Sequence, residues 1–376
     1  MAPTEILARQ HHAGLAPLLD ALGVRADFLS GSLPAVRKRE IHDAIEAGEA
    51  EVVIGTHAVI SAAVSFRRLG LAVVDEQHRF GVAQRAALQA KGGGMEPHVL
   101  ALTATPIPRT LALTFYGDLA ISTIHELPPG RLPVRTEIRG RDALPRIQQF
   151  LASEAAAGRQ SFVVVPLVNE SDALTVASAE AEVTRLREAL PALRIGLVHG
   201  QQRADDRDVT MRAFAGGELD LLVATSVIEV GIDVPNASVM LIEDAERFGL
   251  AQLHQLRGRV GRGGDASFCI LLSDATDALA RERLEVLRGS NDGFEIAEAD
   301  LRLRGAGNLL GTRQSGLPPL RVASLFEPRH VRLAERARDL ADGLVTGDPA
   351  LARRPLLARM RADFAAAEAD EEGDAP

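Results

Sequence analysis

Short apolar runs rich in valine, leucine and isoleucine alternate along the chain with longer stretches that place apolar residues at helical spacing. This alternation is typical of βαβ units, which build a parallel sheet with helices on its faces. The runs are continuously hydrophobic, as expected of strands that are covered on both sides. The pattern therefore predicts an α/β fold in which functional residues follow the carboxyl ends of strands.

The expected strands fall into two groups. In the first half of the chain they are residues 26–30, 50–56, 69–76 and 97–105. In the second half they are residues 161–166, 194–199, 219–225, 238–244 and 266–272. A helix over about residues 142–157 is expected to precede the second group.

The two groups are copies of one domain. Residues 27–60 align without a gap on residues 196–229, and residues 71–84 align on residues 239–252 after a gap of one residue. Identical glycines, glutamates and threonines coincide within apolar runs that keep one register. We therefore expect two tandem α/β domains with the same topology.

The repeat also predicts what the first copy lacks. The opening strand of the second copy, residues 161–166, corresponds to residues 1–3, where the sequence begins. No G-x-x-x-x-G-K-[ST] sequence, whose backbone N–H groups cradle nucleotide phosphates, occurs in the 376 residues. We therefore expect a first domain that lacks its opening strand and phosphate-binding loop and is unstable alone.

Composition adds a few constraints. Hydrophobic residues make up 46% and charged residues 25%, and no apolar run approaches the roughly 20 residues that span a bilayer. The single cysteine, Cys269, lies in an apolar run, which predicts a buried thiol in a reducing, cytoplasmic setting. The net charge of −9 does not exclude nucleic acid, because the basic clusters are local and an acidic tail, residues 366–376, contributes to it. We expect this tail to be disordered.

The strand over residues 69–76 ends in two adjacent carboxylates, Asp75 and Glu76. This is the layout of a Walker B element, in which one carboxylate holds Mg²⁺ and the next polarises the attacking water. The alternative is an acidic cap on the helix that follows the strand. The next strand ends in Thr103-Ala104-Thr105, whose hydroxyls can hydrogen-bond such a carboxylate.

Arginines are concentrated in residues 254–262 of the second copy, where Arg257, Arg259 and Arg262 alternate with glycines. A guanidinium can donate a bidentate fork to phosphate oxygens and stabilise charge in a phosphoryl-transfer transition state. The alternative is a basic surface helix, which the intervening glycines disfavour. Residues 223–237 follow another strand and offer hydroxyls and backbone N–H groups for a phosphate. The histidines form no metal-ligand spacing, so we expect no metal cluster.

Together these segments resemble superfamily 2 helicases, whose two RecA-like lobes match the internal repeat. The matching segments are residues 3–11 (motif Ia), 54–60 (Ib), 75–78 (II), 103–110 (III), 162–168 and 197–202 (IV and its follower), 223–237 (V) and 252–262 (VI). Residues 292–318 resemble the coupling motif of RecG helicases and of the transcription-repair coupling factor, and GTRQSGLP is closer to RecG. The chain departs from the family pattern in having neither motif I nor the amino-terminal wedge domain, which indicates a misassigned start, a frameshift or a fragment rather than a new architecture.

The resemblance implies an α/β fold with two tandem RecA-like parallel-sheet lobes, the first incomplete, and a carboxy-terminal helical hairpin and loop. The expected boundaries are residues 1–138 for the first lobe, 139–290 for the second, 291–365 for the coupling motif and helical region, and 366–376 for the tail. The implied activity is ATP-dependent, 3′-to-5′ remodelling of branched DNA such as stalled forks and Holliday junctions, by a cytoplasmic protein that we expect to be monomeric. This polypeptide is expected to be impaired on its own.

The resemblance also implies a role for each matching residue, with ATP and Mg²⁺ as cofactors. Asp75 would hold the metal, Glu76 would activate water, and Arg259 and Arg262 would face the γ-phosphate. The remaining residues implied for nucleotide binding are Gln77, His78, Gly231 and Asp233. Those implied for the nucleic-acid face are Thr4, Thr56, Gln201 and Thr225. Those implied for coupling are Thr103, Thr105, Arg302, Arg304, Arg313 and Gln314.

Three alternatives stay open on the sequence. A motor of the transcription-repair type would be favoured by a long additional carboxy-terminal domain. An RNA helicase is disfavoured by DEQH at residues 75–78 and by the block at residues 292–318. The polypeptide as it stands could also be a non-enzymatic DNA-binding remnant.

Overall fold

The computed structural model describes residues 1–76, 91, 96–104, 120–124, 126, 128, 130–166, 172–229, 234–310 and 328–363. The chain forms two compact units, one of Met1–Pro106 with Pro128–Gly293 and the other of Ile107–Leu127 with Phe294–Pro376. The first unit contains both copies of the repeat, which we call the first lobe (residues 1–104) and the second lobe (residues 131–293).

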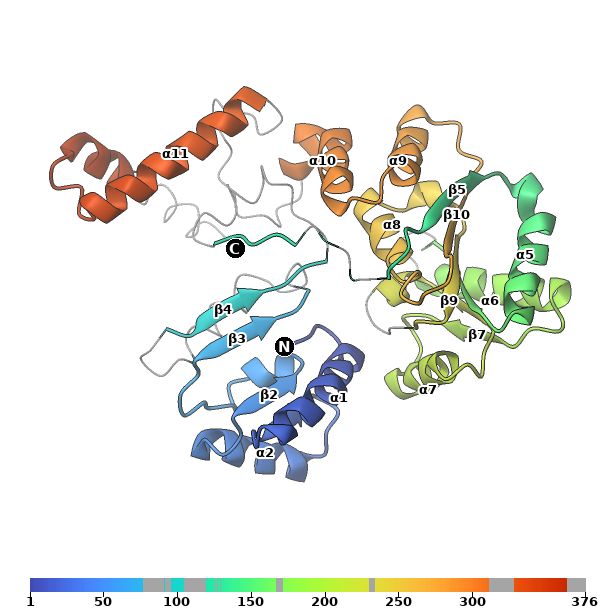
Figure 1. The fold of residues 1–376 in the computed structure, drawn as a ribbon, viewed down its shortest axis with the longest axis horizontal. Helices are drawn as coiled ribbons and strands as arrows, with labels where there is room; N and C mark the ends of the chain where they lie inside the picture. Colours follow the sequence, from blue (N-terminus) through green and yellow to red (C-terminus); the bar gives the residue numbers. More distant parts are fainter. Residues whose placement is uncertain are drawn as a thin grey trace. The chain divides into compact units, whose positions relative to one another are not determined.

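The second lobe is built on one parallel sheet of six strands (Figure 1). The strands are β5 (Arg135–Arg139), β6 (Gln160–Val164), β7 (Ile195–Val198), β8 (Leu221–Ala224), β9 (Ala237–Ile242) and β10 (Phe268–Leu272). Their order is β5-β10-β9-β6-β8-β7, so β6 lies at the centre, between β8 and β9. Every residue of β6, β8 and β9 is buried, which confirms the continuous hydrophobicity expected of covered parallel strands.

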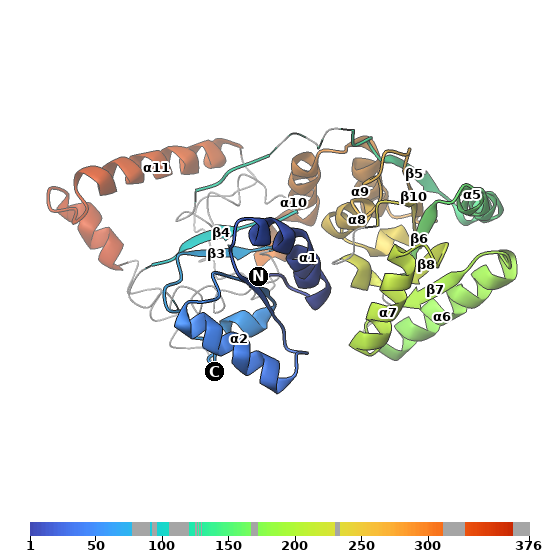
Figure 2. The same ribbon diagram turned by 60° about the horizontal axis from the view of Figure 1, so that its bottom comes forward.

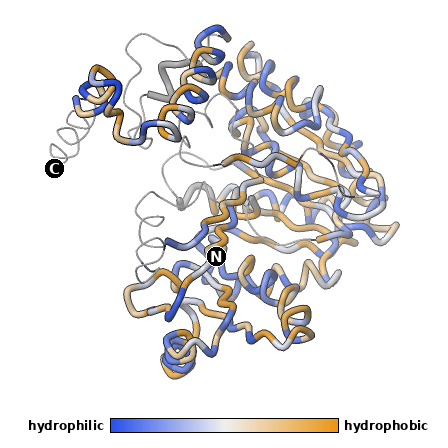
Figure 3. The backbone as a smooth tube through the Cα atoms, turned by 60° about the vertical axis from the view of Figure 1, so that its left-hand side comes forward, coloured by the Kyte–Doolittle hydropathy of each residue, from blue (hydrophilic) through white to orange (hydrophobic). Residues whose placement is uncertain are grey.

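Helices cover both faces of this sheet. They are α5 (Leu144–Ala156), α6 (Asp172–Ala189), α7 (Ala204–Ala215), α8 (Leu250–Arg257) and α9 (Ala278–Gly289). On one face, Val163 of β6 packs in a core cluster with Leu151 of α5 and Leu186 of α6. On the other face, the Phe162 ring lies 4.8 Å from the Phe214 ring of α7, measured between centroids. Figure 3 shows apolar residues along the strands and mixed hydropathy along the helices.

The first lobe repeats part of this topology. Its elements are α1 (Glu5–Ala21), β1 (Ala26–Leu29), α2 (Ala35–Ala47), β2 (Val52–Gly55), the 3₁₀ turn η1 (His57–Ile60), β3 (Leu71–Val74) and β4 (His98–Ala101). Strands β1 and β2 pair in parallel, as β7 and β8 do, and β3 and β4 pair in parallel, as β9 and β10 do. Among the described residues these two pairs remain separate two-stranded sheets.

Met1 and Ala2 lie between the two pairs of the first lobe. The Ala2 N–H donates to the Gly55 carbonyl at 2.9 Å, and the Asp75 N–H donates to the Met1 carbonyl at 3.0 Å. These bonds attach the first two residues to the end of β2 on one side and to the end of β3 on the other.

The second lobe contains the same pair of bonds at the end of β6. The Val165 N–H donates to the Ala224 carbonyl at 2.9 Å, and the Glu243 N–H donates to the Val164 carbonyl at 2.9 Å. Met1 and Ala2 therefore take the positions of Val164 and Val165 in the repeat. The expected alignment of residues 1–3 with the end of the strand at residues 161–166 is confirmed.

The sequence pattern missed β5. This strand crosses the expected lobe boundary between residues 138 and 139, and all of it pairs with β10 in the sheet of the second lobe. Its burial alternates between exposed and buried positions, because it is an edge strand with charged residues on one face. A search for continuous apolar runs cannot find such a strand.

The second unit is helical where it is described. Helix α10 (Gly293–Leu310) begins at the junction of the two units, and α11 (Pro328–Gly347) follows residues that lie outside the described part of the chain. Figure 2 shows α10 and α11 as separate helices. None of the described helices is both long and apolar enough to cross a membrane.

Candidate active site

The two adjacent carboxylates lie where the sequence predicted them, directly after β3. Val74 ends the strand, and the backbone turns at Glu76 into the left-handed region, with φ of 53°. The Glu76 N–H donates to Oδ1 of Asp75 at 2.9 Å, which holds the turn closed. A left-handed backbone at a residue with a side chain costs roughly 1–2 kcal/mol, and such strain is common at functional sites.

Asp75 has a second partner that the sequence motifs did not single out. Nε2 of His11, from α1, lies 2.8 Å from Oδ2 of Asp75. His11 is the last residue of the segment that resembles motif Ia, so its position in that segment was the only available signal. The contact joins α1 to the end of β3 and orients the carboxylate.

Glu76 is directed toward the end of the neighbouring strand β4. Its side chain is buried, and its Oε2 lies 3.5 Å from the backbone N–H of Ala104. The Thr-Ala-Thr segment was expected to meet a catalytic carboxylate through hydroxyls. Ala104 of this segment meets Glu76 through its backbone N–H, and the contact through the threonine hydroxyls stays a prediction.

The donor set of this site suits a hard divalent cation. Asp75 offers carboxylate oxygens, the ligand type that Mg²⁺ prefers, and its side chain is 25% exposed, so water can reach it. The residues present therefore fit a Mg²⁺ ion held by Asp75 through water. For the triphosphate the fit is partial, because the 376 residues contain no Walker A sequence.

The arginine segment divides into one structural arginine and two that are candidates for phosphate. Arg257, the last residue of α8, is buried, and its Nη1 donates to the carbonyls of Leu287 and Ser290 at 2.6 and 2.8 Å. It also lies 3.3 Å from the Thr136 hydroxyl. Arg257 was singled out with the other arginines as a possible phosphate ligand, but its side chain holds the carboxyl end of α9.

Arg259 and Arg262 follow the end of α8. Arg259 is buried, whereas Arg262 is exposed and its Nε donates to the Gly258 carbonyl at 3.2 Å. Between them Gly261 has φ of 75°, and a Cβ there would lie 2.8 Å from the Val134 side chain. Glycine adopts this backbone conformation without steric cost, and the turn at Gly261 sets the position of Arg262 after α8.

The four residues expected at the nucleic-acid face differ in accessibility. Thr4 caps α1, because its Oγ1 accepts from the Leu7 N–H at 3.4 Å. Thr56 begins η1 and is half-buried, and its counterpart Thr225 is buried. Gln201 is exposed after β7. Their roles in DNA binding stay predictions.

Several expected site residues lie outside the described residues. They are Gln77, His78, Thr105, Gly231, Asp233, Arg313 and Gln314. Arg302 is exposed on α10, and Arg304 belongs to the same helix, without a description of its side chain.

The second lobe carries the counterpart of the carboxylate pair, Glu243 and Asp244, at the end of β9. Asp244 forms an ion pair with Arg141, and Oε1 of Glu243 accepts from Arg185 at 2.8 Å. Burial, together with the nearby Glu182 carboxylate, raises the pKa of Glu243 to about 7. Arg141 and Arg185, both in the second lobe, therefore pair with these two carboxylates.

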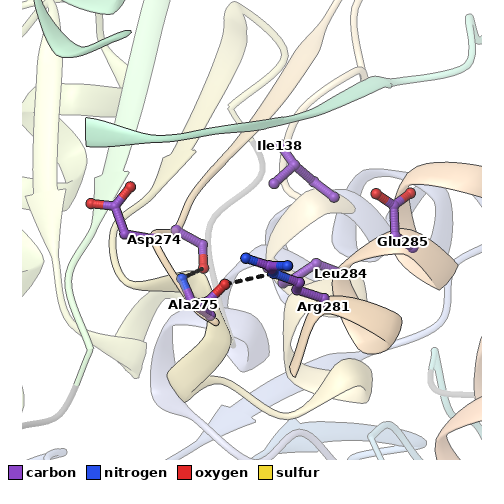
Figure 4. Close-up of a pocket in the computed structure, with 7 residues that line it drawn as sticks. Ile138, Asp274, Ala275, Arg281, Leu284 and Glu285 are labelled. Atoms are coloured by element: carbon purple, nitrogen blue, oxygen red, sulfur yellow. Dashed lines mark hydrogen bonds between the residues drawn. The ribbon is translucent and has the colours of Figure 1, made fainter. Parts of the chain in front are cut away.

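A separate pocket of about 380 Å³ lies where β10 ends and α9 begins (Figure 4). Asp274 and Arg281 are among its lining residues. Nε of Arg281 donates to the Ala275 carbonyl at 2.8 Å, and Oδ1 of Asp274 accepts from the Arg141 N–H at 3.1 Å. Both charged groups thus help to hold the loop after β10.

Three family models match the chain. Residues 1–114 match the DEAD/DEAH box helicase model, and residues 142–264 match the helicase conserved C-terminal domain. Residues 290–360 match the model of domain 3, C-terminal, of ATP-dependent DNA helicase RecG. The two helicase models fall on the two copies of the repeat, so the chain is a superfamily 2 helicase sequence with two RecA-like lobes.

Whole-protein relatives point to one branch of this class. ATP-dependent DNA helicase RecG of Synechocystis sp. is 49% identical over 358 residues, 95% of this chain and 43% of that protein. The Escherichia coli K12 protein of the same name is 50% identical over 333 residues, 87% of this chain and 48% of that protein. The solved structure of RecG bound to a three-way DNA junction covers 90% of this chain and 43% of its own, with 40% identity and a TM-score of 0.72.

The chain belongs to the RecG family of ATP-hydrolysing DNA helicases. It spans about half the length of the relatives that it matches. Saccharomyces cerevisiae Dbp5 bound to RNA and ADP BeF3, at 14% identity and a TM-score of 0.56, shares the fold alone.

Proposed function

We propose that this chain is the motor portion of an ATP-dependent helicase that moves 3′ to 5′ and remodels branched DNA such as stalled forks and Holliday junctions. The observation that carries the proposal is the carboxylate pair after β3. The Glu76 backbone N–H donates a hydrogen bond to the Asp75 carboxylate, and the Ala104 N–H, after the next strand, approaches the Glu76 carboxylate. The relative solved on a three-way DNA junction supports branched DNA as the substrate.

In this proposal the chain's own residues divide the work of hydrolysis. Asp75, oriented by His11, would hold Mg²⁺, and the ion would supply charge neutralisation at the phosphates. Glu76 accepts a proton from the attacking water. Arg259 and Arg262 approach the γ-phosphate, while Arg257 fixes the end of α8 from which they extend.

The same proposal includes a limit on this polypeptide by itself. Without a Walker A sequence, the backbone N–H cradle for the phosphates is missing from its 376 residues, and we propose that it hydrolyses ATP poorly alone. We also propose that it acts as a monomer in the cytoplasm; the buried thiol of Cys269 is consistent with a reducing compartment. The carboxy-terminal match to a RecG model favours this function over the transcription-repair type.

The test is ATP hydrolysis measured with a three-way junction and with linear duplex DNA. The chain alone should hydrolyse slowly, and joining it to a Walker A-containing amino-terminal region should restore junction-stimulated turnover. In that restored protein Glu76→Gln should lower kcat by at least about a hundredfold while nucleotide still binds. Asp244→Asn, at the matching position of the second lobe, is the control and should retain turnover.

Two results would contradict the proposal. Turnover by the chain alone at the level of the restored protein would show that it needs no added phosphate loop. Unchanged hydrolysis by the Glu76→Gln protein would show that another group is the base.

A further inference from the structure

Helix α1 contacts the ends of two different strands of the first lobe. His11 lies in the second turn of this helix, and its Nε2 is 2.8 Å from Oδ2 of Asp75, which directly follows β3. An ionised carboxylate only accepts hydrogen bonds, so Nε2 carries the hydrogen and donates it. At the start of the helix, Glu5 contacts the turn that follows β1. One helix thus joins the candidate metal ligand to a second region of the lobe.

The two carboxylate oxygens of Asp75 are held by different donors. Oδ1 accepts from the Glu76 N–H at 2.9 Å, and Oδ2 accepts from His11. Two donors fix the plane of the carboxylate, whereas a single donor would allow it to rotate. Each oxygen keeps a further lone pair, and the Asp75 side chain is 25% exposed, so a hydrated cation can reach it. His11 therefore decides which lone pairs of Asp75 are presented to a metal ion.

The turn after β1 corresponds to a segment that is expected to contact nucleic acid. In the alignment of residues 27–60 on residues 196–229, Ser32 takes the position of Gln201. Ser32 is exposed, so a DNA backbone can reach it. Its hydroxyl lies 2.7 and 2.6 Å from Oε1 and Oε2 of Glu5. Ser32 therefore links this turn to the first residue of α1.

Side-chain contacts also fix the first turns of α1 on β1. Nη2 of Arg9 donates to Glu5 at 2.6 Å, and the guanidinium carbon of Arg9 lies 4.7 Å from the centroid of the Phe28 ring in β1. The His12 ring lies 5.8 Å from the same ring, measured between centroids. Backbone hydrogen bonds make the helix move as one body. A displacement of the turn after β1 would therefore be passed along α1 to His11.

We propose that His11 is a positioning residue that couples DNA binding at the turn after β1 to metal binding at Asp75. This inference rests on the proposed function, in which DNA stimulates hydrolysis at this site. DNA at Ser32 holds Glu5 and the start of α1 in place, and His11 then keeps Asp75 in the orientation that accepts a hydrated metal ion. Coupling of this kind is reciprocal, so metal binding favours DNA binding by the same factor.

The test measures metal binding by the restored protein, with Mn²⁺ as the probe and a non-hydrolysable ATP analogue present. Free Mn²⁺ is followed by its electron paramagnetic resonance signal, with and without a three-way DNA junction. In the unaltered protein the junction should tighten Mn²⁺ binding by at least about fivefold. This measurement does not depend on turnover.

Substitutions of His11 test the contact with Asp75. His11→Leu removes the donor and should weaken Mn²⁺ binding by about tenfold or more, because a side chain that orients a metal ligand affects affinity on that scale. The junction should then have no effect. His11→Gln places an amide N–H near the position of Nε2 and should retain both properties. His12→Leu is the matched control, because His12 contacts Phe28 instead, and it should behave as the unaltered protein does.

A substitution at the other end of α1 separates coupling from orientation. Glu5→Ala removes the acceptor of Ser32 and leaves the contact between His11 and Asp75 in place. Mn²⁺ binding without DNA should be retained, and the tightening by the junction should be lost. This variant also decides the question if His11→Leu fails to fold. Retained tightening in Glu5→Ala would overturn the proposal.

Two further outcomes would overturn the coupling. One is a His11→Leu protein that responds to the junction as the unaltered protein does, and the other is a His11→Gln protein as impaired as His11→Leu. The proposed function fails on a different measurement, the phosphate released by the unaltered protein in the presence of the junction. If the junction stimulates phosphate release but leaves Mn²⁺ binding unchanged, only the coupling is wrong.

Discussion

Glu76 in the first lobe and Asp244 in the second occupy the same position of the repeat and share a left-handed backbone, with φ of 53° and 45°. They differ in their partners. Asp244 forms an ion pair with Arg141 of its own lobe, whereas Oε2 of Glu76 lies beside the Ala104 backbone N–H. The same strained turn therefore holds a neutralised carboxylate in one lobe and a candidate general base in the other.

The strain at Glu76 predicts a trade between stability and activity. Glu76→Gly should stabilise the folded chain by about 1 kcal/mol, because glycine adopts this φ without steric cost. In the restored protein it should abolish hydrolysis. Thermal unfolding and phosphate release would measure the two effects. Glu46→Gly, in the regular helix α2, is the control and should destabilise by about 1 kcal/mol; an equal loss at Glu76 would argue against backbone strain.

The two ends of the arginine segment should respond differently to mutation. Arg257→Met removes three contacts of a buried guanidinium and leaves the Leu287 and Ser290 carbonyls without it, so we expect a loss of about 3–5 kcal/mol in stability. Arg262→Met, at an exposed position, should change stability by less than about 0.5 kcal/mol and reduce hydrolysis in the restored protein. Denaturant unfolding would measure the stability of both variants. Similar losses would show that Arg257 and Arg262 do not differ in their structural role.

Glu243 predicts a pH dependence of stability. Burial raises the pKa of Glu243 in the folded chain to about 7. Its protonation therefore adds to the free energy of unfolding fully below the ordinary pKa near 4.5, and this contribution is lost as pH rises through about 7. Glu243→Gln should therefore flatten the stability curve between about pH 4.5 and 7 and leave the variant more stable at pH 8, on the order of 1–3 kcal/mol. Unfolding across pH, with the exposed Glu188→Gln as control, would measure this. If stability varied with pH in the Glu243→Gln variant as it does in the unmodified chain, Glu243 would not be the source of the pH dependence.

Gly261 predicts a local packing requirement next to the candidate arginines. In Gly261→Ala the new Cβ would lie 2.8 Å from the Val134 side chain at a φ of 75°, so stability should fall by about 1–3 kcal/mol. Gly264→Ala is the matched control, since a Cβ there meets nothing within 4 Å. Equal melting temperatures for the two variants would show that the turn adapts without cost.

Much of the fold followed from local sequence. The central strands of the second lobe were predicted because burial on both faces demands continuous apolar residues, and the ends of strands located Asp75 and Glu76. The edge strand β5 was missed because only one of its faces is covered, which leaves an alternating pattern. The repeat, rather than any single motif, predicted that residues 1–3 correspond to the strand at residues 161–166, and the hydrogen bonds of Met1 and Ala2 agree with that position.

The contacts that define the site could not be predicted, because they join distant segments. His11 and Asp75 are 64 positions apart, and Glu76 and Ala104 are 28 apart. Likewise, nothing in the sequence distinguishes Arg257 from Arg259 and Arg262. Only the fold brings the end of α9 to Arg257 and makes a charged side chain part of the interior.

Arg257 also has a mechanical consequence. Its guanidinium donates to the Leu287 carbonyl in the last turn of α9 and to the Ser290 carbonyl just after it, so one side chain at the end of α8 ties that helix to the end of α9. A displacement of α8 relative to α9 would stretch these hydrogen bonds, so the two helix ends are expected to move together. Arg257 therefore couples the ends of α8 and α9 mechanically.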